Sequence, residues 1–135
     1  MQKVNVICVG KLKEKFYIEA VAEYEKRLQR HCKLTVTELT EQRLSDTPSD
    51  TEIKKALAAE AEAIREKLQQ FALEGRSQLT FLIGGSCGLD ESLKKEADLR
   101  LSFSPMTFPH HLARVMLLEQ IYRGYQILEG SKYHK

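Results

Sequence analysis

The chain has 135 residues, of which 42% are hydrophobic and 30% charged, which predicts a single globular domain with a substantial core. It has no apolar run near the roughly 20 residues of a membrane span and no signal-peptide pattern, which excludes a membrane protein. The net charge is only +2, but residues 1–33 carry eight Lys and Arg against four acidic residues, whereas residues 38–66 carry four against eight. The basic ends are a mild indication of a polyanionic partner.

The cysteines do not form a recognisable motif. Cys8, Cys32 and Cys87 are odd in number and widely spaced, so we expect neither a disulfide framework nor a structural zinc site. Reduced thiols are typical of a cytoplasmic protein.

Hydrophobic spacing in the first half of the chain alternates between strand and helix patterns. An apolar run ends at Gly10, and an amphipathic stripe of Tyr17, Val21, Tyr24 and Leu28 follows it. The expected elements are a buried strand over Val4–Val9, a helix over Lys13–Arg30, a half-buried strand over Leu34–Leu39, and a long helix capped by Asp50 or Thr51 that runs to about Leu73 and stops near Gly75.

The second half continues the alternation. We expect a strand over Leu79–Ile83, a short helix over Leu89–Ala97 capped by Asp90, a last short strand over Leu99–Phe103, and a final helix over His110–Leu128 that begins after Pro109. This order predicts an α/β domain with a mainly parallel sheet. In such sheets ligands bind beyond the carboxyl ends of the strands.

Two loops lie at such strand ends. The first, Gly84-Gly85-Ser86-Cys87-Gly88, either closes a tight turn or lets a ligand approach the backbone, and it matches neither a Walker A motif nor GxGxxG. The second, residues 103–109, is stiffened by two prolines and carries Met106 and Phe108. It is either a plain connection or an apolar slot for an adenine ring.

Three features of the C-terminal region involve ionisable side chains. His110 and His111 open a helix, whose dipole favours a neutral imidazole that can accept a proton, although either may simply cap the helix or lie on its surface. Arg114 shares a helix face with apolar residues, so it reaches solvent, pairs with a carboxylate or faces an anionic ligand. Glu119 and Arg123 are spaced as a surface ion pair, and the broad apolar face of this helix suits a dimer interface.

The chain ends in Tyr133-His134-Lys135. After Gly130 no helical pattern remains, so the end is either a disordered tail or a segment whose aromatic, imidazole and cationic groups bind a nucleotide.

Several stretches together resemble one family. They are Val9-Gly10-Lys11-Leu12-Lys13-Glu14-Lys15, Phe81-Leu82-Ile83-Gly84-Gly85-Ser86-Cys87-Gly88-Leu89, Leu101-Ser102-Phe103-Ser104-Pro105-Met106-Thr107-Phe108-Pro109-His110, Leu118-Glu119-Gln120-Ile121-Tyr122-Arg123 and the terminal Tyr133-His134-Lys135. The chain resembles the ribosomal RNA large-subunit methyltransferase H family, within the SPOUT class, over nearly its whole length.

The resemblance implies a homodimeric, metal-free enzyme that transfers a methyl group from S-adenosyl-L-methionine to N3 of a pseudouridine in large-subunit ribosomal RNA, on assembled ribosomes. It also implies an α/β fold with a C-terminal trefoil knot. The family's cofactor positions fall on Gly84, Phe103, Ser104, Pro105, Met106, Thr107 and Phe108.

The same resemblance places the target nucleotide near His110, Arg114, Tyr133 and His134. We hypothesise that His110 or His134 takes the N3 proton, that Arg114 holds a phosphate or the negative charge developing on the base, and that Tyr133 stacks on the base.

The chain departs from the family in one place. Family members are longer, and here the acidic helix of residues 51–66 appears joined directly to a later family helix near residues 64–67. The missing part is a strand and loop that include a further cofactor contact. The three explanations are a stretch omitted from this sequence, a true deletion, and a different alignment of the acidic helix. The alternatives to an enzyme are a non-catalytic ribosome-binding homodimer without cofactor affinity, and a nucleotide-binding protein that uses Gly84-Gly85 for phosphate.

Overall fold

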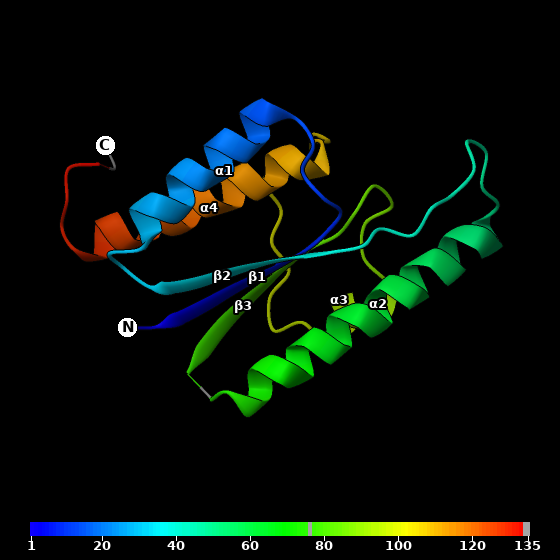
Figure 1. Cartoon of the computed structure of the whole chain (residues 1–135), viewed down its shortest axis with the longest axis horizontal. Helices are drawn as coiled ribbons and strands as arrows, with labels where there is room; N and C mark the ends of the chain where they lie inside the picture. The colour runs from blue at the N-terminus through cyan, green and yellow to red at the C-terminus, as the bar shows by residue number, and fades with distance from the viewer. Residues whose placement is uncertain (76, 134–135) are drawn as a thin grey trace.

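Strand β1 (Lys3–Val9) is the centre of a three-stranded sheet, with β2 (Lys33–Leu39) on one side and β3 (Gln78–Ile83) on the other. Both neighbours run parallel to β1. The computed structural model describes residues 1–75 and 77–133. Helices cover both faces of the sheet, as Figure 1 shows: α1 (Lys15–Leu28) and α4 (His110–Leu128) on one face, α2 (Asp50–Leu73) and α3 (Glu91–Glu96) on the other. The predicted α/β class with a parallel sheet is confirmed, and the C-terminal trefoil knot stays a prediction.

Alternate side chains of β1 supply two separate cores. Val4, Val6 and Cys8 pack into one cluster with residues of α1 and α4, and Ile7 and Val9 pack into the other with residues of α2 and α3. Successive side chains of a strand point to opposite faces, so a strand that is apolar at nearly every position needs helices on both sides. This requirement explains why the short apolar run near the N-terminus became the central strand.

The long helix α2 begins at Asp50, so its N-cap lies one residue before the earlier of the two predicted caps. Ser49, rather than Asp50 or Thr51, is the N-cap: its hydroxyl accepts a hydrogen bond from the Glu52 amide at 3.1 Å, while the Glu52 carboxylate accepts one from the Ser49 amide at 3.2 Å. This reciprocal pair is a capping box. The predicted cap of α3 is confirmed, because Asp90 accepts a hydrogen bond from the Ser92 amide at 2.9 Å.

The predicted strand over Leu99–Phe103 was wrong. The segment between α3 and α4 forms no strand, and Leu99 and Leu101 are 72% and 65% exposed. Leucine alternates with polar residues here, but alternation produces a strand only where a neighbouring edge and a core receive it. In the described part of the chain the sheet therefore has three strands, and the segment crosses to α4 as a surface loop.

Candidate functional site

Polar side chains gather where the three strands end and α4 begins. β1 is followed by Gly10, β2 ends next to Glu38 and leads to Glu41, and β3 leads into the Gly84–Gly88 turn. The N-terminal turn of α4 brings His110, His111 and Arg114 to the same end of the sheet. The sequence placed the candidate site at this end, and the structure brings these groups together there.

Arg114 is held inside this end of the molecule. It is 2% exposed, its guanidinium pairs with the Glu38 carboxylate, and it donates a second hydrogen bond to the Gly10 carbonyl at 2.9 Å. Of the three alternatives for a cation on this face, the structure shows pairing with a carboxylate. Arg114 thereby ties α4 to the ends of β1 and β2.

Glu38 is the partner that the sequence analysis missed. Burial acts to raise the pKa of its carboxyl, but hydrogen bonds from the Leu12 amide and Arg114 outweigh burial and hold that pKa below its ordinary value. A signal was present: an arginine on an apolar face needs an acidic partner, and Glu38 is the one acidic residue within β2.

Glu41 was also missed, and it closes the turn after β3. Its carboxylate accepts hydrogen bonds from the Ser86 amide at 2.7 Å and from the Ser86 hydroxyl at 2.6 Å. Burial acts to raise the pKa of Glu41, but the bonds from Ser86 leave it below its ordinary value. A side chain at Gly85 would place its Cβ 2.7 Å from this carboxylate, so glycine is needed at position 85 for the contact to form.

The turn itself is tight. A Cβ at Gly84 would lie 2.4 Å from the carbonyl group of Gly88, and the Gly88 amide donates a hydrogen bond to the Gly85 carbonyl at 3.0 Å. Gly88 has φ +82°, which favours glycine. The tight-turn interpretation is therefore confirmed, and the approach of a ligand to Gly84 stays a prediction.

His110 and His111 form an enclosed pair. Their ring centroids are 4.1 Å apart, and the Nε2 atom of each is buried without a hydrogen-bond partner among the described residues. A Cβ at Gly10 would lie 3.5 Å from Nε2 of His110 and 3.7 Å from Nε2 of His111. Burial, followed by the neighbouring His111, lowers the pKa of His110. The structure thus favours the neutral imidazole that the sequence led us to expect.

The predicted cofactor loop lies on the surface. Phe103 and Met106 are 42% and 71% exposed. The loop is braced by its own serines: the Ser104 hydroxyl accepts a hydrogen bond from the Met106 amide at 3.0 Å, and the Ser102 hydroxyl donates one to the Ser104 carbonyl at 3.1 Å. Pro105, Thr107 and Phe108 belong to the same loop, with Phe108 half-buried. The loop therefore presents apolar side chains and backbone groups side by side.

Tyr133 lies far from the two histidines. Its ring packs edge-on against Tyr122 with centroids 5.0 Å apart, and its hydroxyl donates a hydrogen bond to Glu119 at 3.1 Å. Because a helix rises about 1.5 Å per residue, Glu119 is about 14 Å along α4 from His110. A single chain does not bring Tyr133 to His110 in this structure. His134, the fourth predicted residue of this group, lies outside the described residues.

The predicted ion pair of Glu119 and Arg123 is confirmed at 3.1 Å. It is less exposed than a typical surface pair, because the side chain of Glu119 is only 19% exposed and the ring of Tyr133 covers the Arg123 guanidinium at 5.1 Å.

Within the described ranges no group of three or more His, Cys, Asp or Glu side chains is placed to hold a metal ion. The helices that the structure describes include none that is long and apolar enough to cross a membrane. Cys8 and Cys32 are buried and Cys87 is exposed, all three with free thiols. Burial raises the pKa of the Cys8 thiol to about 11, so this residue acts as part of the core.

The fold and the site define a class: an α/β protein whose polar groups and glycine turn lie at the carboxyl ends of a parallel sheet, where this class binds its ligands. Comparison with known proteins then identifies the family. The family model described as "Predicted SPOUT methyltransferase" matches residues 2–70 and 54–134. The chain belongs to the SPOUT methyltransferase family.

Named relatives match over almost the full length. A protein of Streptococcus equi subsp. zooepidemicus named "Ribosomal RNA large subunit methyltransferase H" is 40% identical, with 98% of this chain and 99% of the relative covered. A protein of the same name from Leuconostoc mesenteroides is 39% identical over the same shares. The resemblance inferred from the sequence motifs is confirmed.

The lengths of these matches differ from the length of the chain. The alignment with the Streptococcus equi relative extends over 158 residues, 23 more than the 135 residues present here. The relative therefore has at least that many residues without a counterpart in this chain. Residues 54–70, which lie within α2, take part in both matches to the family model.

Proposed function

We propose that this chain is an S-adenosyl-L-methionine-dependent methyltransferase that methylates N3 of a pseudouridine in large-subunit ribosomal RNA. It would act in the cytoplasm as a homodimer on the assembled ribosome. The observation that carries the proposal is the match at 40% identity, over 98% of the chain, to a relative named for methylation of this RNA.

The residues at the strand ends fit the cofactor. Gly84 leads the turn after β3, and the exposed Phe103 and Met106 of the loop before α4 offer apolar contacts for an adenine ring. We assign Gly84 and the loop of Phe103, Ser104, Pro105, Met106, Thr107 and Phe108 to cofactor binding. S-adenosylmethionine supplies an electrophilic methyl group when bound.

The chain's own part in the chemistry is to remove a proton. N3 of pseudouridine carries a proton that must leave as the methyl group arrives, and a neutral imidazole near its reference pKa is a suitable acceptor. Burial and His111 lower the pKa of His110, which keeps its imidazole neutral and able to accept a proton. Its Nε2 is enclosed against Gly10 in the free chain, so acting as the base requires that the ring turn toward the substrate. His134 is the second candidate for this role.

The structure refines the other two roles that we propose. Arg114 is 2% exposed and occupied by Glu38 and Gly10. This supports a positioning role, in which Arg114 fixes the start of α4 and with it His110, over direct contact with a phosphate. For Tyr133 to stack on a base near His110, the tail must leave its place on α4 or the base must sit between two subunits.

A second candidate function is a ribosome-binding homodimer without catalytic activity. The alignment that exceeds this chain by 23 residues supports it. So does the overlap of the two family matches in α2, which is where we expect the missing strand and loop, near residues 64–67. If that segment carries cofactor contacts, its loss would remove cofactor affinity and leave the fold and the RNA surface in place.

Calorimetric titration of the 135-residue chain with S-adenosylmethionine separates the two candidates. Binding followed by transfer of a labelled methyl group to large ribosomal subunits supports the enzyme, and mass spectrometry of the digested RNA then identifies the methylated nucleoside. A folded chain that binds ribosomes but not the cofactor supports the second candidate. His110→Gln tests the base, with Lys54→Gln on the exposed side of α2 as a matched control. An unchanged methylation rate in His110→Gln would remove His110 from the mechanism.

A further inference from the structure

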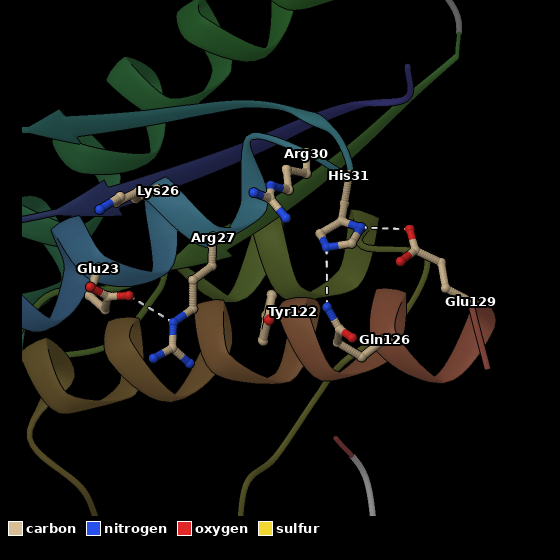
Figure 2. Close-up of a pocket in the computed structure, with 8 residues that line it drawn as sticks. All are labelled: Glu23, Lys26, Arg27, Arg30, His31, Tyr122, Gln126 and Glu129. Carbon is tan, nitrogen blue, oxygen red and sulfur yellow. Dashed lines mark hydrogen bonds and ion pairs between the residues drawn. The ribbon is translucent and has the colours of Figure 1, made fainter. Parts of the chain in front are cut away.

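A groove of about 530 Å³ runs between the last turns of α1 and α4, at the opposite end of these helices from the histidine pair. Figure 2 shows one wall formed by Lys26 and Arg27 of α1 and by Arg30 in the turn that follows α1, and a floor on α4 formed by Tyr122 and Gln126. His31 closes one end. None of these residues belongs to the site assigned above.

The groove has uncompensated positive charge. Both acids of the groove have a partner: Glu23 pairs with Arg27 at 2.8 Å, and a carboxylate oxygen of Glu129 lies 2.7 Å from Nδ1 of His31. Lys26 and Arg30 are exposed, and among the described residues neither forms a hydrogen bond or an ion pair. With His31 neutral, the three basic and two acidic residues that line the groove leave a net excess of one positive charge, and the two unpaired cations, Lys26 and Arg30, face solvent.

The groove also has an ordered aromatic floor. The Arg27 guanidinium lies 5.6 Å from the centre of the Tyr122 ring and 5.3 Å from that of Tyr24. The His31 ring stacks on Tyr125 with centroids 5.6 Å apart and contacts Tyr122 at 5.8 Å. These contacts fix the aromatic side chains of the floor. Binding of a ligand would therefore restrict few side chains other than those of Lys26 and Arg30. A rigid aromatic surface flanked by free cations is suited to a single-stranded nucleic acid, which offers phosphates and planar bases.

The positive surface continues past the groove. Lys33 and Lys3 are register partners at the starts of β2 and β1, and both line a neighbouring hollow of about 540 Å³. Five of the eight basic residues in the first 33 positions therefore lie at this end, namely Lys3, Lys26, Arg27, Arg30 and Lys33. The excess of basic residues in the N-terminal sequence is therefore concentrated around this groove and the neighbouring hollow.

We propose that this groove binds the sugar–phosphate backbone of the RNA substrate at a distance from His110. The inference rests on the proposed function for the identity of the polyanion, and on the groove itself for the place of contact. Gln126 lies about 24 Å along α4 from His110, so the groove contributes to RNA affinity and orientation and takes no part in methyl transfer.

The test reverses the two free charges in Lys26→Glu/Arg30→Glu. The matched control, Lys54→Glu/Lys55→Glu, makes the same change in net charge at two exposed lysines of α2. Binding of each chain to a fluorescent RNA hairpin and to large ribosomal subunits is measured across a salt series. Loss of two phosphate contacts should weaken binding about tenfold or more and lower the slope of log affinity against log salt by about 1.5.

Further readouts separate docking from folding and from catalysis. S-adenosylmethionine titration and thermal unfolding should be equal in the two double variants. The charge-conserving Lys26→Arg/Arg30→Lys should bind RNA almost as the parent does. In a methylation assay the groove variant should raise KM for ribosomes and leave kcat within about twofold.

Three results would overturn the inference: equal weakening by the groove and control variants, an unchanged salt slope in the groove variant, or a change of oligomeric state on sedimentation in the groove variant alone, which would assign the groove to a second copy of the chain. Failure of the proposed function gives a different pattern. In that case the parent chain transfers no methyl group, yet the groove variant still loses RNA affinity relative to the control.

Discussion

The two ends of α4 handle positive charge in opposite ways. At its start, Arg114 is buried and enclosed by Glu38 and the Gly10 carbonyl. Near its end, Lys26 of the facing helix α1 and Arg30 in the turn after it are exposed and without an ion pair in the described chain. A buried charge must be paired or it destabilises the fold, whereas an exposed free charge contributes little to folding and is available to a ligand. The first arrangement fixes geometry, and the second serves recognition.

Removal of the buried cation Arg114 is expected to have the largest effect and tests this contrast most directly. Arg114→Met should lower the free energy of unfolding by about 3 kcal/mol, because the partly buried Glu38 carboxylate loses its main partner. Arg27→Met, at the exposed groove pair, should cost much less, because water screens an exposed ion pair. Urea denaturation of both variants measures the difference. Equal losses would mean that Arg114 does not hold the strand ends together.

The glycines of the two ends give the next largest contrast. Gly84→Ala should cost about 2 kcal/mol, because its Cβ would meet the Gly88 backbone at 2.4 Å, and it should also weaken S-adenosylmethionine binding. Gly124 lies within α4 with nothing within 4 Å of its Cβ position, so Gly124→Ala should raise stability by about 1 kcal/mol. Thermal unfolding and calorimetry check both. A neutral Gly84→Ala would show that the turn after β3 opens freely.

The strand-end site should also set the acid sensitivity of the fold. The pKa of Glu41 is lowered by its bonds to Ser86, so its stabilising contribution is present above its unfolded value of 4.5 and is lost as pH falls through the folded pKa. The pKa of His110 is lowered from 6.5 by burial, so the unfolded chain binds more protons below pH 6.5 and stability declines there.

Melting temperatures between pH 4 and pH 8 test both contributions. His110→Gln should flatten the decline that begins near pH 6.5, and Glu41→Gln should flatten the decline below pH 4.5. If the parent chain and His110→Gln have the same pH profile, then His110 is not held neutral by its surroundings.

The smallest expected effect concerns the loop that leads to α4. Leu101 is 65% exposed, so Leu101→Ser should change the free energy of unfolding by less than about 0.5 kcal/mol. Leu118 is fully buried, and Leu118→Ala should cost about 3 kcal/mol. Chemical denaturation compares the two. A loss above about 1 kcal/mol for Leu101→Ser would show that the loop packs against the fold, as a fourth strand would.

Much of the fold could be predicted because its signals are local. The apolar run Val4–Val9, the helix stripe of Val21 and Leu28, and the caps at Asp90 and Pro109 each lie within a few residues of the element that they define. The position of Gly84 at the carboxyl end of the sheet followed from element order alone, since parallel strands place their ends at one edge, whereas the strand expected to lead to His110 is absent.

The rest depended on contacts between residues far apart in the chain. Arg114 and Glu38 are separated by 76 positions, and Glu41 and Ser86 by 45, so no local pattern could choose these partners. Leu99–Phe103 has the alternation of a strand, but in this structure no edge or core receives it. Tyr133 could lie near the site or along α4, and contacts with Tyr122 and Glu119 decided the second.

By itself, then, the sequence determined the order of most elements, the end of the sheet where the candidate site lies and the family to which the chain belongs. Only the tertiary structure decided which charges are enclosed and which stay free, because charge pairing depends on distance in space and on access to water. The same basic side chain fixes the fold at Arg114 and faces solvent at Arg30. That difference separates the candidate active site from the groove that we assign to RNA.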